Sequence, residues 1–246
     1  SKWDELKNEG VVMLHIHGGG FISMSSFSHE SYLRLWATAL QIPIISVDYR
    51  KAPSYTYPVQ VEECYRVYKW LLANAHKEIL KCPLRKIIVA GDSAGGNLSL
   101  NVTVRAIHDG MRIPDALALS YPATYLSECP STARLLGLVD PLVAMNFLKM
   151  CAGSLSHKGK DIPTGRKQGY FPFMSPAIAP VEVFKKFPPV YINTGTLDPL
   201  FDDTVYISQV MAANNGGRVK LDVYDGLAHG YMNMTDLVPE AKQATD

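Results

Sequence analysis

One stretch of the sequence decides the fold: residues 87–97 read IIVAGDSAGGN. The apolar, mostly β-branched start predicts a buried strand, and the glycine-rich end opens a helix. Gly91 and Gly95 stand two positions on either side of Ser93, where a side chain would collide with the backbone of a sharp turn. This G-x-S-x-G pattern between a strand and a helix lifts a serine hydroxyl above a sheet. It predicts Ser93 as a nucleophile, with a tight turn and an incidental serine as the alternative.

Strand-like and helix-like segments alternate over most of the chain. The apolar runs are continuous, which indicates a sheet with both faces covered, and their alternation with helical segments indicates mostly parallel strands between two helical layers. Sites in such sheets form at the carboxyl ends of the strands. The predicted strands are 11–17, 42–47, 87–90, 116–120, 190–193 and 219–224, and the predicted helices are 30–40, 58–75, 95–108 and 202–213.

Residues 126–172 interrupt this alternation. They contain one predicted helix, 141–151, followed by a polar, glycine-rich run over 152–169. We therefore expect one α/β domain over residues 1–246 that carries a small helical cap over one end of its sheet.

A run of three glycines follows the first predicted strand. Such a run is costly in chain entropy, so it predicts a backbone that must approach another group closely. Acyl transfer needs several N–H donors that converge on an oxyanion. The expected donors are Gly18, Gly19, Gly20 and Ala94. The run lacks a P-loop lysine and Rossmann spacing, although a flexible loop or a phosphate cradle is the alternative. We expect His17 to order this loop by hydrogen bonding, and His15 to be a core histidine.

An activated serine needs a base, and the base needs an orienting carboxylate. Asp198 follows the predicted strand 190–193, and His229 follows the last strand, which places both at the edge where Ser93 lies. Asp202 and Asp203 are rivals for the acid, but we expect them to cap the next helix. The other histidines precede the acid in the chain or lie on helices and in the insertion.

The bulk composition excludes several classes of protein. The formal net charge is +1 and 47% of residues are hydrophobic, so we expect a globular chain without a nucleic-acid surface. No apolar run is long enough to cross a bilayer, and residues 1–10 carry no signal-peptide pattern, which favours a cytoplasmic location. The four scattered cysteines favour free thiols, and no metal pattern is present. A processed or shortened chain is one interpretation of the first residue, Ser1.

These motifs together resemble the hormone-sensitive lipase family of α/β-hydrolases. The resemblance rests on HGGGF at 17–21 and GDSAGGN at 91–97. Segments 28–33, 43–50, 62–64, 197–199, 202–203 and 229–230 resemble the hormone-sensitive lipase branch in particular. It implies a triad of Ser93, Asp198 and His229, an oxyanion hole from the glycine loop and Ala94, and ester hydrolysis without a metal or cofactor.

The sequence departs from the family in two ways. Only about ten residues precede the first strand, so we expect the family's N-terminal cap to be absent or truncated here, and the insertion is short. Docking on lipid droplets and control by phosphorylation are therefore not carried over.

The substrate is less narrowly defined than the chemistry. An apolar acyl pocket lined by Phe21, Met24, Phe147 and Met150, with Leu148, would favour short- to medium-chain acyl esters, or acylglycerols; an ordinary core is the alternative. An arylacetamide deacetylase-like amide and ester hydrolase is a second interpretation. A non-catalytic small-ligand receptor of the gibberellin-receptor type is a third, although such receptors lack the histidine. A homodimer is left open.

Overall fold

The computed structural model describes residues 10–126, 131–136, 145–155 and 174–245. Six strands form one sheet in the order β2-β1-β3-β4-β5-β6, and every pair of neighbours is parallel. This confirms the predicted parallel sheet. The strands are β1 (Val11–Ile16), β2 (Ile44–Val47), β3 (Lys86–Asp92), β4 (Ala116–Ser120), β5 (Val190–Gly195) and β6 (Val219–Tyr224).

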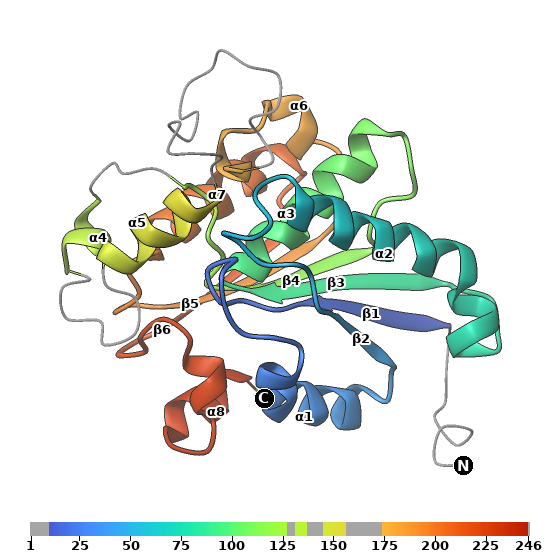
Figure 1. The fold of residues 1–246 in the computed structure, drawn as a ribbon, viewed down its shortest axis with the longest axis horizontal. Helices are drawn as coiled ribbons and strands as arrows, with labels where there is room; N and C mark the ends of the chain where they lie inside the picture. Colours follow the sequence, from blue (N-terminus) through green and yellow to red (C-terminus); the bar gives the residue numbers. More distant parts are fainter. Residues whose placement is uncertain (1–9, 127–130, 137–144, 156–173, 246) are drawn as a thin grey trace.

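Helices cover both faces of the sheet, as predicted (Figure 1). The helices α1 (Glu30–Leu40) and α8 (Pro239–Thr245) lie on one face, and Trp36 Nε1 donates a hydrogen bond to Thr245 O at 2.9 Å between them. The opposite face carries α2 (Val59–Ala75), α3 (Ala94–His108), α6 (Val181–Phe184) and α7 (Phe201–Asn214). Two short helices, α4 (Thr132–Leu136) and α5 (Met145–Ser154), lie toward the edge where the strands end.

Several boundaries differ from the sequence-based ones. β3 runs to Asp92 instead of residue 90, so the residue before Ser93 still belongs to the sheet. A π-helical turn, η2 (His76–Leu80), continues α2, and the short turns η1 (Phe27–His29), η5 (Pro176–Ile178) and η6 (Tyr231–Met234) were not predicted, nor were α4, α6 and α8. The helix predicted over 141–151 begins at Met145 within the described residues, and most of the polar run 152–169 lies outside them.

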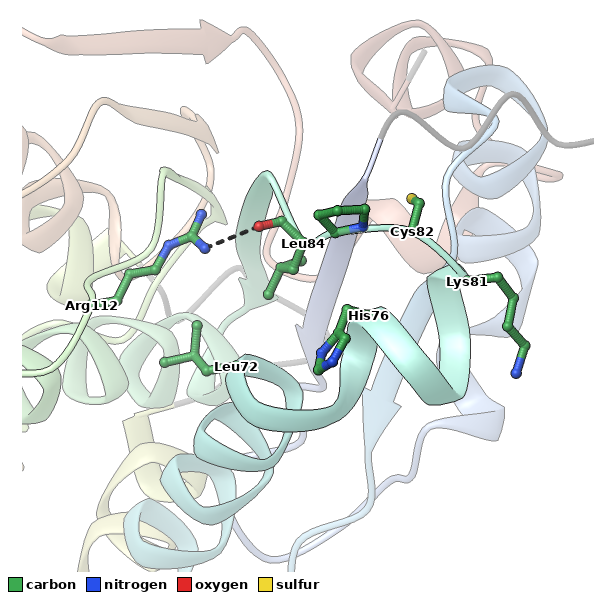
Figure 2. A pocket seen from close by; sticks show the side chains of 7 residues that line it. Leu72, His76, Lys81, Cys82, Leu84 and Arg112 are labelled. Carbon is green, nitrogen blue, oxygen red and sulfur yellow. Dashed lines mark hydrogen bonds between the residues drawn. The ribbon is translucent and has the colours of Figure 1, made fainter.

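The edge where the strands begin carries a shallow hollow of about 440 Å³ (Figure 2). It is lined by Leu72, His76, Lys81, Cys82, Pro83, Leu84 and Arg112. The guanidinium of Arg112 donates to Leu84 O at 3.3 Å, to Arg85 O at 2.6 Å and to Asp115 Oδ2 at 2.8 Å. Asp115 Oδ2 also accepts the N–H of Ile87 at 2.8 Å, so these side chains anchor the start of β3.

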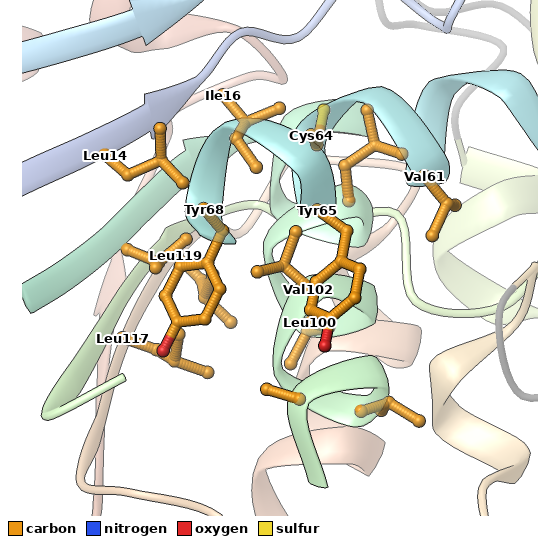
Figure 3. Packing of buried hydrophobic residues seen from close by; sticks show 14 of the residues in the cluster. Leu14, Ile16, Val61, Cys64, Tyr65, Tyr68, Leu100, Val102, Leu117 and Leu119 are labelled. Atoms are coloured by element: carbon orange, nitrogen blue, oxygen red, sulfur yellow. The ribbon is translucent and has the colours of Figure 1, made fainter. Parts of the chain in front are cut away.

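The main core lies between the sheet and the helices α2 and α3 (Figure 3). Tyr68 of α2 and Leu100 and Val102 of α3 are fully buried against Leu14 of β1 and Leu119 of β4. Each such side chain stabilises the fold by about 1.5–3 kcal/mol relative to exposure. This packing holds α3, and therefore the turn before it, in a fixed position on the sheet.

Three of the four cysteines lie in the described residues. Cys64, Cys82 and Cys151 form no disulfide, as predicted for them, and Cys129 lies outside the described residues.

Candidate active site

Ser93 occupies the sharp turn between β3 and α3. Its backbone has φ 52° and ψ −119°, an unusual conformation for a residue with a side chain. Its N–H donates to Ser120 O at 2.9 Å, and its carbonyl accepts the N–H of Ala123 at 3.0 Å, so the chain after β4 holds the turn. A Cβ on Gly95 would lie only 1.9 Å from Ile16 O. The crowding expected from the sequence is therefore present.

The structure brings Ser93, Asp198 and His229 into one chain of hydrogen bonds. His229 Nε2 lies 2.8 Å from Ser93 Oγ, and His229 Nδ1 lies 2.9 Å and 3.0 Å from the two carboxylate oxygens of Asp198. Asp198 is only 1% exposed, and its Oδ1 accepts the N–H of Leu200 at 2.7 Å. A histidine held this way has one nitrogen fixed by the carboxylate and the other directed at the serine hydroxyl.

The loops that carry Asp198 and His229 are joined to each other. The N–H of Leu197 donates to Leu227 O at 3.1 Å, and Thr196 Oγ1 donates to Asp225 Oδ1 at 2.9 Å. The ring of Tyr121 packs 4.8 Å from the His229 ring. These contacts limit the freedom of His229 without changing its hydrogen bonds to the acid.

The three amides of the glycine loop after β1 differ in their hydrogen bonding. The N–H of Gly18 donates to Asp92 Oδ1 at 3.0 Å. Gly19 and Gly20 have φ of 107° and 62°, and neither amide donates a hydrogen bond to any described residue. The same holds for the N–H of Ala94 at the start of α3. The three free amides lie on the loop and the turn that meet at Ile16 and Gly95.

His17 lies beneath the glycine loop and is fully buried. Its Nδ1 lies 2.6 Å from Gly18 O, its ring stacks on Tyr49 at 4.4 Å, and Tyr49 Oη donates to His17 O at 3.0 Å. Burial lowers the pKa of His17 to about 4, so the ring is neutral at pH 7. These contacts suit a side chain that orders the loop.

His15 is enclosed in the same way. Its two ring nitrogens lie 2.9 Å from Ser46 Oγ and 2.9 Å from Tyr32 Oη, and burial lowers its pKa to about 3. It is a hydrogen-bonded core histidine.

The residues expected to line an acyl pocket separate into two groups. Phe21 is 3% exposed and belongs to the hydrophobic core, whereas Met24 and Met150 are 44% and 51% exposed. Phe147 faces the glycine loop, because a Cβ on Gly20 would lie 3.4 Å from its ring. Cys151, which sequence reasoning did not select, lies even closer to that position, with its Sγ at 2.3 Å.

The prediction that Asp202 and Asp203 cap the next helix is wrong. Both lie in the first turn of α7, but no side chain caps that helix. Asp203 Oδ2 instead accepts a hydrogen bond from the buried guanidinium of Arg134 at 2.5 Å, and Asp202 Oδ2 accepts the N–H of Ala133 at 2.8 Å. The two aspartates therefore link α4 to α7. The prediction failed because their partners are distant in the sequence.

No helix within the described ranges has the length and apolar character needed to cross a membrane.

Comparison with known proteins gives one family match. A family model described as an alpha/beta hydrolase fold matches residues 13–233. The chain is 31% identical to the esterase LipI of Mycobacterium tuberculosis over 97% of this chain and 71% of that protein. It is 44% identical to the hormone-sensitive lipase of Mus musculus over 59% of this chain. Among solved structures, a hyperthermophilic esterase from the archaeon Pyrobaculum calidifontis has a TM-score of 0.85 at 29% identity, covering 95% of this chain and 73% of that one.

The match to hormone-sensitive lipase covers a small part of that protein. The aligned region spans 19% of the mouse lipase, whereas it spans most of LipI.

Proposed function

We propose that this chain, which belongs to the hormone-sensitive lipase family of α/β-hydrolases, is a serine esterase that hydrolyses carboxylic esters through an acyl-enzyme. One observation carries the proposal: Asp198, His229 and Ser93 form a continuous hydrogen-bonded chain next to the loop and turn whose three amides, those of Gly19, Gly20 and Ala94, donate to none of the described residues. The esterases among the relatives support this class of reaction.

The proposed reaction begins with attack by Ser93 Oγ on the ester carbonyl while His229 Nε2 accepts the hydroxyl proton. Asp198 holds the Nδ1–H tautomer and stabilises the imidazolium that forms. His229 then gives the proton to the leaving alcohol, and the acyl group stays on Ser93. A water molecule, deprotonated by His229, attacks the acyl-enzyme, and the acid leaves as the Ser93 hydroxyl is restored.

The oxyanion is assigned to the amides of Gly19, Gly20 and Ala94. Gly18 is left out because its N–H already donates to Asp92. A preorganised amide is effective because it needs no reorientation when charge develops, and removal of one such donor costs about 10²–10³ in kcat.

The proposed substrates are short- to medium-chain acyl esters, with acylglycerols as the longer alternative. Phe147 at the glycine loop and the exposed Met24 and Met150 would supply apolar contact with the acyl chain, and α4 and α5 would form the described part of the cap. A series of p-nitrophenyl esters tests this. A maximum at four to eight acyl carbons is expected, and a steady rise to long chains would contradict it.

Fluorophosphonate labelling followed by peptide mapping tests the proposed nucleophile. We expect an adduct on Ser93 and rapid hydrolysis of p-nitrophenyl butyrate, with neither in Ser93→Ala. Ser154→Ala, which alters a serine on the surface of α5, serves as the matched control and should behave as the wild type. An unlabelled wild type would favour the receptor alternative, and p-nitroacetanilide turnover above that of the ester would favour the amidase.

A further inference from the structure

We infer that Asp92 is a positioning residue: its buried carboxylate fixes the glycine loop relative to Ser93, so that Gly19 and Gly20 present their amides to the oxyanion. This inference rests on the proposed esterase function. Asp92 precedes the nucleophile in the chain but faces away from the reacting atoms, toward a group of buried polar side chains.

The contact between Asp92 and the glycine loop is direct and close. Asp92 is 3% exposed, and its Oδ1 accepts the N–H of Gly18 at 3.0 Å. A Cβ on Gly18 would lie 2.4 Å from Asp92 Oδ2, so only glycine allows this approach. The carboxylate and the first glycine of the loop are therefore matched in shape as well as in hydrogen bonding.

This hydrogen bond continues the sheet where its backbone pairing stops. β1 and β3 pair in register up to Ile16 and Gly91. Beyond that pair the two chains diverge, one into the glycine loop and the other into the turn at Ser93. The side chain of Asp92 then supplies the acceptor that a strand carbonyl would otherwise supply. One carboxylate group therefore fixes the position of the glycine loop relative to the nucleophile.

The carboxylate is itself held from its other side. His29 Nε2 lies 3.3 Å from Asp92 Oδ2, and Tyr32 Oη donates to Asp92 Oδ1 at 3.3 Å. His29 is anchored in turn, with its Nδ1 3.0 Å from Ser25 O. Burial opposes ionisation of Asp92, but the hydrogen bond and charge of His29 outweigh it and lower the pKa of Asp92 to about 2. The acceptor is thus ionised and fixed in place.

A purely structural role would give a different result from a positioning role. If the carboxylate only stabilised the fold, its removal would lower the melting temperature and leave turnover per folded molecule unchanged. If it positions the loop, the loss appears in the transition state, because a displacement of about 1 Å can cost about 10² in rate. Affinity for a tetrahedral adduct should fall in parallel.

The experiment compares Asp92→Ala and Asp92→Asn with Asp115→Ala and Asp115→Asn. Asp115 is the matched control, because its carboxylate accepts the N–H of Ile87 at the other end of the same strand. We expect Asp92→Ala to lower kcat by about 10–100-fold with KM changed less than about threefold. Asp92→Asn keeps one acceptor oxygen but places an NH₂ group against the donors around it, so its kcat should fall, but less than that of Asp92→Ala. The Asp115 variants should keep kcat within about twofold.

The second measurement separates geometry from folding. A hexyl trifluoromethyl ketone forms a tetrahedral adduct with an active serine, whereas the matching methyl ketone binds mainly as a ground-state ligand. Inhibition by the trifluoromethyl ketone should weaken about as much as kcat falls in the Asp92 variants, with the methyl ketone little changed.

The outcomes are distinct. Unchanged kcat and unchanged trifluoromethyl ketone inhibition in folded Asp92 variants would overturn the inference while leaving the esterase proposal intact. A wild type with no ester turnover would overturn both. If the Asp92 variants do not fold, His29→Gln removes one support of the carboxylate; a selective loss of about 3–10-fold is expected, and unaltered values would overturn the inference.

Discussion

Pairs of glycines at the two edges of the sheet differ in how closely the backbone around them is packed, although Gly10, before β1, and Gly226, after β6, do not follow this contrast. At the edge where strands end, a Cβ on Gly95 or Gly195 would lie within 2.0 Å of a carbonyl oxygen. At the edge where strands begin, a Cβ on Gly110 or Gly216 would meet nothing within 4 Å. The first edge holds Ser93 and its partners, and the second holds the open hollow of Figure 2.

This difference shows that open space is a poor guide to the reactive part of this molecule. The hollow is lined in part by Arg112, whose hydrogen bonds to Arg85 O and Asp115 hold the start of β3. The other edge is crowded because backbone amides and three polar side chains must be brought together. The following substitutions test whether activity follows that crowding.

The largest effect is expected when the acid at the crowded edge is changed. Asp198→Asn should lower kcat by about 10⁴, because the amide no longer holds the required tautomer of His229. Asp202→Asn is the control, since Asp202 lies four residues on and accepts the N–H of Ala133 instead. Kinetics on p-nitrophenyl butyrate would check both, and equal losses in the two variants would contradict the assignment of the acid.

The next largest effect is a loss of stability, expected when a side chain is added to a closely packed glycine. Gly95→Ala should cost about 3 kcal/mol or more of unfolding free energy, because its Cβ would meet Ile16 O at 1.9 Å. Gly110→Ala should cost only about 1 kcal/mol, from its φ of 63° in open space. Urea denaturation of the two variants measures the contrast. Equal losses of unfolding free energy in the two variants would mean that the difference in packing around Gly95 and Gly110 does not affect stability.

The buried histidines His15 and His17 should make the protein less stable in acid. The pKa of His15 is lowered to about 3 and that of His17 to about 4, both mainly by burial. Below pH 6.5 these two side chains therefore bind more protons in the unfolded chain than in the folded one, so their contribution to stability falls as the pH falls. Each histidine should cost about 1–2 kcal/mol at pH 5. Calorimetry at pH 7 and pH 5 checks this, and His15→Gln should flatten the dependence.

The smallest effect on activity is expected at the open edge. Arg112→Ala removes hydrogen bonds to Leu84 O, Arg85 O and Asp115, and should cost about 1 kcal/mol of stability. Turnover per folded molecule should stay within about twofold of the wild type. A tenfold loss of kcat would show that the two edges are coupled and would break the comparison.

The layout of the sheet and the grouping of Ser93, Asp198 and His229 could be predicted because both depend on local signals. Each strand is a short apolar run, and chain order assigns the acid and base to loops after later strands. The end of β3 was missed, because Asp92 is polar and its place in the sheet depends on its pairing with Ser120 of β4. A single polar residue at the end of an apolar run gives no periodic signal.

The supporting contacts could not be predicted from local sequence. His29 and Tyr32 reach Asp92 across about sixty positions of the chain, and Arg134 reaches Asp203 across a similar distance. Asp203 resembles a helix-capping residue because it lies in the first turn of α7, but its partner is Arg134, so the capping prediction failed. Such pairs are decided by tertiary packing, for which one sequence offers no pattern.

The order of Ser93, Asp198 and His229 along the chain also bears on how the protein is made. Synthesis proceeds from the amino terminus, so the glycine loop and the turn at Ser93 leave the ribosome well before β6 and the loop that carries His229. Until that loop arrives, the serine has no base within reach and stays an ordinary alcohol. The proposed hydrolase would therefore be inert throughout most of its own translation and become reactive only when the last strand joins the sheet.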